Sequence, residues 1–70
     1  MDRIDTIVEM AITYTLTVLR TAPLHLGAAL AGLERLRTDL MFEVPEHPAL
    51  ERLRSFLDEI AQRAIESSLH

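Results

Sequence analysis

The fold of this chain is decided by residues 2–20, DRIDTIVEMAITYTLTVLR, which form a helical pattern with an unusually wide apolar surface. At about 100° per residue, the apolar side chains cover roughly 240° of the circumference, and a narrow polar strip holds Glu9, Arg20 and three threonines. Two neighbouring helices of a short chain can shield only part of such an arc. We therefore expect this helix to contact a second protein molecule, most simply another copy.

One part of this helix has a competing strand pattern. Residues 13–18, TYTLTV, are rich in β-branched side chains and partly alternate polar with apolar positions. A single strand would have no partner, because no second strand pattern occurs in the chain. The helical spacing on both sides of this stretch therefore predicts a continuous helix.

Two further helices follow, and a proline marks the start of each. Pro23 and Pro48 suit the first turn of a helix, and His47 is placed to cap the third one. Apolar residues recur at three- and four-residue intervals in both segments, as in the helices of a bundle. The sequence thus predicts an all-α fold, a helical hairpin plus a third helix, packed as an oligomeric helical bundle. It forms a single domain of residues 1–70, with helices at approximately 3–21, 23–42 and 47–68.

The back of the second helix carries small residues. Gly27 and Ala31 are spaced four apart, as are Ala28 and Gly32. Such pairs permit the close approach of another helix, so this part of the segment is a candidate contact surface. The alternative is a featureless exposed face, on which each glycine costs the helix about 1 kcal/mol.

The composition restricts the chain to a small packed domain that needs support beyond its own core. Its 70 residues are 49% hydrophobic, with two glycines and three prolines, which excludes disorder. A domain of this size buries only about 60% of the surface of its unfolded chain. Cysteine is absent, so disulfides and thiolate ligands cannot stabilise it, and oligomerisation is the remaining route. We expect a cytoplasmic protein.

Charge and hydropathy narrow the class of partner. The net charge of −4 opposes binding to nucleic acid and to anionic lipid. Arg20 and Pro23 divide the apolar run 11–33 into two pieces that are too short to cross a bilayer. We therefore expect a protein partner, either a second copy of this chain or a cognate protein. Nucleic acid and a membrane are disfavoured.

No constellation of catalytic or metal-binding residues stands out. The serines lack a neighbouring base and acid, and no pair of carboxylates lies in an apolar setting. Asp39, Glu43, Glu46 and His47 lie close together in sequence, but their spacing fits no recurrent metal-ligand pattern. A solvated acidic loop explains them better. We expect no enzymatic activity, no metal site and no cofactor.

Two arginines occupy positions on otherwise apolar helix faces. Arg37 and Arg54 either extend their stems over apolar surface toward water or form charged pairs across a subunit boundary. The predicted interface therefore combines three features. These are the part of the apolar arc that neighbouring helices cannot shield, the small residues of the second helix, and the two arginines. The interface comprises Met10, Ile12, Leu16, Leu19, Ala28, Ala31, Arg37 and Arg54.

Three functions fit these features. The first is a small non-enzymatic protein-interaction module, assembled as a homodimeric helical bundle. The second is a chaperone-like or antitoxin-like subunit of a hetero-complex; the chain resembles small secretion chaperones in length and helical content alone. The third is a helical bundle that binds a small ligand between its helices, with Tyr14, His25 and Arg37 as the polar groups.

Overall fold

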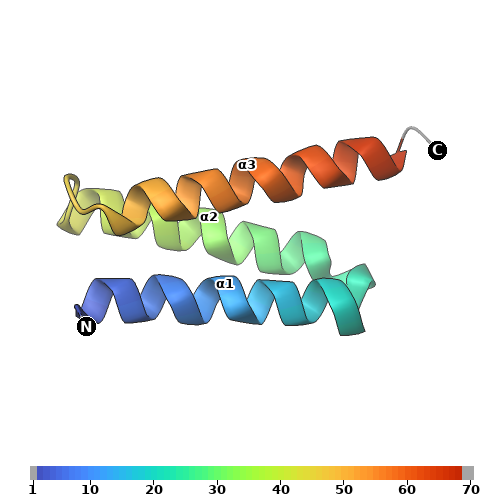
Figure 1. Ribbon diagram of the computed structural model, residues 1–70, viewed down its shortest axis with the longest axis horizontal. Coiled ribbons are helices and arrows are strands. Elements are labelled where there is room, and N and C mark those ends of the chain that lie inside the picture. Colours follow the sequence, from blue (N-terminus) through green and yellow to red (C-terminus); the bar gives the residue numbers. More distant parts are fainter. Residues whose placement is uncertain (1, 69–70) are drawn as a thin grey trace.

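The computed structural model describes residues 2–68, apart from the side chains of residues 64, 65, 67 and 68, and these residues contain helices and no strand. The elements are α1 (Arg3–Thr21), the 3₁₀ turn η1 (Pro23–His25), α2 (Leu26–Glu43) and α3 (Ala49–Ser68). α2 returns antiparallel to α1, and α3 runs in the direction of α1 again (Figure 1). The predicted all-α fold of three helices is confirmed.

Local chemistry sets both ends of α1. Asp2 caps its start, because Oδ1 of this side chain accepts a hydrogen bond from the Ile4 N–H at 2.9 Å. The helix ends at Thr21, since Ala22 precedes Pro23 and the residue before a proline avoids helical geometry.

The second and third helices begin slightly later than the sequence predicts. Residues 23–25 form the separate turn η1, so that α2 begins at Leu26. α3 begins at Ala49, because His47 precedes the helix and caps it. The Nδ1 atom of His47 accepts a hydrogen bond from the Ala49 N–H at 3.0 Å. The predicted capping role of His47 is therefore confirmed.

The β-branched stretch 13–18 is helical throughout, as predicted. The hydroxyls of Thr15, Thr17 and Thr21 each donate to the carbonyl oxygen four residues earlier, at 2.9, 3.0 and 2.7 Å. These bonds satisfy the hydroxyls within the helix itself. Thr15 can consequently be buried although it is polar.

The core lies where the three helices meet, and each helix packs against the other two. Val8 of α1 lies in it between Leu33 and Leu40 of α2 and the first three turns of α3. Leu53 and Val8 are fully buried. The buried core cluster consists of Val8, Leu33, Leu40, Ala49, Leu53 and Leu57.

The helices form an elongated body of 38 × 20 × 17 Å. Its radius of gyration is 12.5 Å, whereas a compact chain of 70 residues has one of about 11 Å. α1 and α3 diverge toward the C-terminal end of α1 (Figure 1). Within residues 2–68, no helix has the length and apolar character needed to cross a membrane.

Candidate functional site

A groove of about 340 Å³ lies between α1 and α2. Its α1 wall presents Tyr14, and its α2 wall presents the small residues Ala28 and Gly32. Aspartate, glutamate and arginine are missing from the residues that line it. The α1–α2 groove is lined by Ala11, Tyr14, Thr15, His25, Ala28, Ala29, Gly32, Leu33 and Leu36.

The few polar side chains of the α1–α2 groove do not require a polar ligand. The hydroxyl of Thr15 is buried but already donates to the Ala11 carbonyl at 2.9 Å. Tyr14 and His25 are exposed and can bond to water. Among the described residues, every buried side-chain nitrogen or oxygen has a hydrogen-bond partner. The groove is therefore suited to apolar contact.

Gly32 has no role in the packing of the protomer. A Cβ atom added to Gly32, or to Gly27 on another side of α2, would meet nothing within 4 Å. Neither glycine has a positive φ, so the backbone does not require glycine at these positions. Alanine at either position would favour the helix by about 1 kcal/mol. Contacts within the protomer therefore leave the glycine that lines the groove unexplained.

Large apolar side chains are exposed on α1, η1 and α2. Met10 and Tyr14, one turn apart on α1, are 67% and 64% exposed, and Leu24 of η1 is 98% exposed. Phe42, near the end of α2, is 91% exposed. Neighbouring exposed side chains of this size, such as Met10 and Tyr14, are characteristic of a contact surface.

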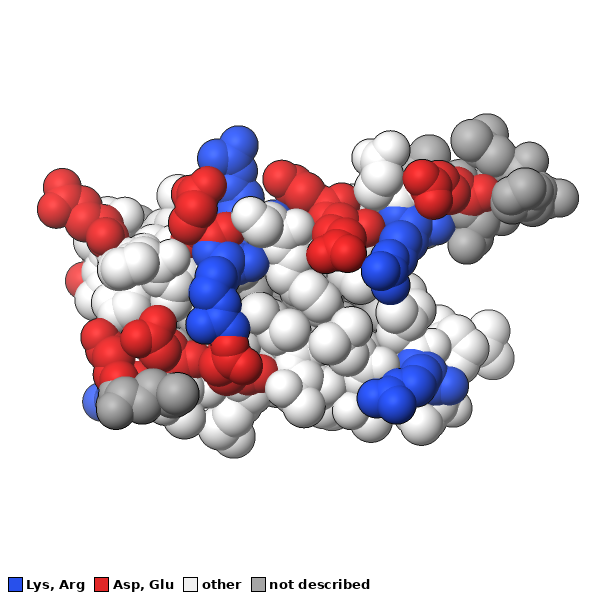
Figure 2. Space-filling model, in the orientation of Figure 1, with Lys and Arg blue, Asp and Glu red and all other residues white. Residues whose placement is uncertain are grey.

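The other apolar residues of the predicted interface on α1 lie on a different side of this helix from Met10 and Tyr14. Ile12 and Leu19 are half-buried, and Ile12 packs against the core cluster. Leu16 remains 38% exposed. Charged side chains gather along α3 and around the start of α1 on the face in Figure 2, and the middle of that face is uncharged. Thus contacts within the protomer cover Ile12 and Leu19 more than they cover Met10 and Tyr14.

The remaining predicted interface residues lie on two other parts of the surface. Ala28 lines the α1–α2 groove, and Ala31 is exposed outside its lining. Arg37 and Arg54 come together across a smaller groove of about 200 Å³ between α2 and α3, beside Glu51. Within the part of the chain that the structure describes, neither arginine forms an ion pair. Their pairing across a subunit boundary stays a prediction.

The polar strip of α1 contributes one contact between helices. Glu9 forms an ion pair with Arg52 of α3. Both side chains are substantially exposed, so the pair adds little stability. An arginine partner is one of the two ordinary environments for a glutamate at this position, the other being solvent.

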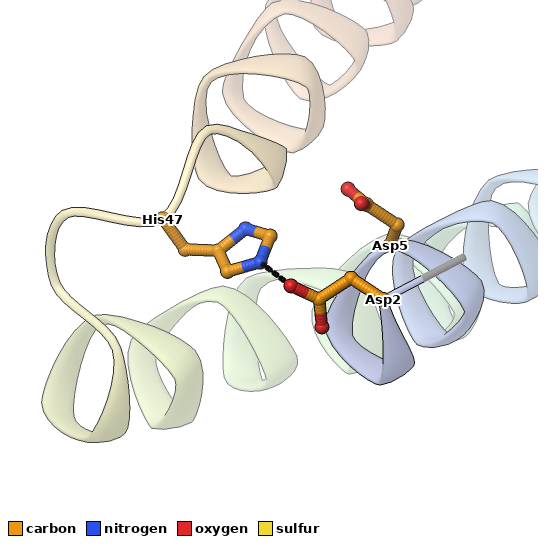
Figure 3. A group of neighbouring side chains, drawn as sticks. All are labelled: Asp2, Asp5 and His47. Atoms are coloured by element: carbon orange, nitrogen blue, oxygen red, sulfur yellow. Dashed lines mark hydrogen bonds and ion pairs between the residues drawn. The ribbon is translucent and has the colours of Figure 1, made fainter.

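Asp2, Asp5 and His47 form a cluster at the end of the bundle where α1 and α3 begin (Figure 3). Nε2 of His47 lies 2.7 Å from Oδ2 of Asp2. Because Nδ1 of the same ring accepts from Ala49, Nε2 carries the proton and donates it to the carboxylate. The hydrogen bond from His47, then that from the Ile4 N–H, lowers the pKa of Asp2 below its ordinary value of 3.8.

This cluster caps two helices at once. Asp2 uses one oxygen to cap α1 and the other to hold His47, which caps α3. A metal ion would have to displace one of these bonds, because both ring nitrogens of His47 are engaged. The acids near His47 in space are Asp2 and Asp5, whereas those near it in sequence are Glu43 and Glu46. Only folding brings Asp2 to a residue 45 positions away.

Sequence patterns identified part of the α1–α2 groove. The four-residue spacing of small residues predicts Ala28 and Gly32 as contact positions, and Tyr14 and His25 are two of the three polar groups expected in a ligand site; all four line the groove. Arg37, the third polar group named, lies in the other groove. His25 lies in the turn η1 and is exposed.

No family model matches this chain, and no curated protein or solved structure is significantly similar to it. Its function is therefore inferred from its own residues and their geometry.

Proposed function

We propose that this protein is a small non-enzymatic interaction module that works by self-association, as a homodimeric helical bundle. Association rather than chemistry is supported by the character of the α1–α2 groove, which is apolar and free of charged residues. A cytoplasmic location is part of this proposal and rests on the cysteine-free composition.

The observation that carries the proposal is the large surface of the protomer. Its accessible surface is 5314 Å², whereas a compact monomer of 7.9 kDa has about 4400 Å². The excess of about 900 Å² is close to the 800 Å² or so that one partner contributes to a standard interface. The exposed Met10, Tyr14 and Leu24 show that apolar side chains contribute to this surface.

The need for additional stability supports the same proposal. The core cluster of buried residues is small, and the chain has no cysteine for disulfides. Small domains of this kind commonly depend on oligomerisation. Covering the exposed apolar side chains with a second copy would add burial at about 25 cal/mol per Å² before the costs of association are subtracted.

Analytical ultracentrifugation of the native chain tests the proposal. At concentrations from about 1 to 100 µM, we expect a reversible equilibrium between a 7.9 kDa protomer and a species of twice that mass. A folded protomer that stays monomeric over this whole range would contradict the proposal. Circular dichroism on the same samples establishes that the chain is helical.

A small-ligand site in the same groove is a second candidate. Its volume is at the lower end of ordinary ligand pockets, and Tyr14 and His25 both line it. It is less well supported, because both polar residues are exposed and no buried polar atom of the described residues awaits a partner. A monomer in the ultracentrifugation experiment would favour this candidate over self-association.

A further inference from the structure

We propose that the α1–α2 groove receives the same groove of a second copy, with the two α2 helices antiparallel and crossing at Gly32. This inference rests on the proposed self-association and adds the face, the orientation and the register. It assigns a role to Gly32, which has none in the packing of the protomer.

The spacing along α2 is self-complementary about Gly32. His25 lies seven residues before this glycine and Asp39 seven residues after it, and both are exposed. Seven residues are close to two helical turns, so Gly32 and Asp39 share one side of α2, and His25 lies in η1 directly before the helix. In an antiparallel pair centred on Gly32, His25 of each copy faces Asp39 of the other, and the two contacts are related by symmetry.

The side chains between Gly32 and the two ends of this contact are also complementary in size. With the same centre, Ala28 of one copy lies opposite Leu36 of the other, and both residues line the groove. A large side chain then enters the space above a small one on each side of the axis, as in packed helices. At the centre, two glycines allow the backbones to approach closely.

A second copy fits this groove better than an unrelated protein does, because one face carries both the small residues and the projecting ones. An isologous interface requires this self-complementarity. The lining also carries no Asp, Glu or Arg, so two chains of net charge −4 can meet there without desolvating like charges. The groove between α2 and α3, by contrast, contains Arg37, Glu51 and Arg54.

A pair of glycine variants tests whether the α1–α2 groove forms the dimer interface. Gly32→Leu and Gly27→Leu place the same side chain on α2 at two positions where a new Cβ meets nothing within 4 Å. We expect Gly32→Leu to raise the dimer Kd by about tenfold or more, because two leucines cannot fit at the crossing point. Gly27→Leu, outside the groove lining, should keep the native Kd. Circular dichroism confirms that both variants are helical.

Single cysteines test the orientation and register, because the native chain contains no cysteine. Gly32→Cys should form a disulfide-linked dimer under mild oxidation, and Gly27→Cys should not. His25→Cys and Asp39→Cys, each alone, should remain uncrosslinked, since the two equivalent positions lie about 21 Å apart in an antiparallel pair. A mixture of these two variants should crosslink into a heterodimer.

The outcomes separate the two proposals. A monomeric native chain overturns both. A native dimer in which Gly32→Leu and Gly27→Leu have equal Kd values overturns the assigned face alone. Self-crosslinking of His25→Cys, with no crosslink in the mixture, would show that the helices are parallel and overturn the register proposed here.

Discussion

At the scale of single residues, Asp2 and His47 tie the starts of two helices together. Each side chain uses one atom to cap its own helix and another to hold the other side chain. The unpaired N–H groups at a helix start need such acceptors. This shared cap positions α3 against α1 at one end of the bundle, where the helices lie closer than at the other end (Figure 1).

Substitution of His47 separates its two roles. We expect His47→Ala to lower the free energy of unfolding by about 1 kcal/mol, because the Ala49 N–H loses its acceptor. His47→Asn should recover most of this loss, since asparagine is a good cap, although it is too short to keep the bond to Asp2. Urea denaturation measures both variants. Equal destabilisation by the two substitutions would refute a capping role.

We expect the free energy of unfolding to depend on pH through the carboxyl group of Asp2. Its pKa is lower in the folded chain than the ordinary value of 3.8, so the unfolded chain binds a proton more readily. The stabilisation is therefore complete above about pH 5 and is lost as the pH falls through the folded pKa. In thermal melts between pH 6 and about pH 2, Asp2→Asn should lose less stability than the native chain.

The same site allows an independent check by NMR titration. The bond from His47 is the largest cause of the lowered pKa of Asp2, and the Ile4 N–H is the next. The pKa of Asp2 should consequently rise toward 3.8 in His47→Asn without reaching it. An unchanged pKa would show that the two side chains do not interact in solution.

At the scale of elements, α1 is covered unevenly. The sequence predicts that two neighbouring helices shield only part of its wide apolar arc, but the pattern does not show which edge they cover. In the structure, Ile12 and Leu19 on one edge are half-buried, and Met10 and Tyr14 on the other are exposed. The interface residues predicted from the arc are therefore divided between two sides of the helix.

The glycines of α2 provide a prediction at this scale. Gly27→Ala should raise the free energy of unfolding by up to about 1 kcal/mol, because alanine favours the helix and its Cβ meets nothing within 4 Å. Chemical denaturation measures this gain. A loss of stability would indicate a close contact at Gly27 that is absent from the protomer.

At the scale of the whole molecule, the elongated shape leaves more surface than one small core requires. Because unfolding of a dimer releases two chains, its midpoint temperature depends on concentration. We expect a tenfold increase in protein concentration to raise Tm by about 3–6 °C. Differential scanning calorimetry at two concentrations measures this shift. The shift of Tm with concentration should be smaller in Gly32→Leu than in Gly27→Leu, because the first substitution weakens the dimer.

Features that depend on neighbours within a few residues are predictable from the sequence alone. The helical periods and the capping role of His47 follow from such local spacing, although α2 and α3 begin a little after the prolines that were expected to start them. For the same reason the all-α class was predictable, although residues 13–18 favour a strand when they are considered alone.

Contacts between residues that are distant in the sequence depend on the tertiary fold. It placed Asp2 beside His47, brought Arg37 and Arg54 to one groove, and left Tyr14, Ala28 and Gly32 lining another. A helical pattern gives the angle of each side chain about its own axis, but it does not say which side a neighbouring helix will cover. That choice depends on packing all three helices at once, and it determines which apolar surface remains open to a partner.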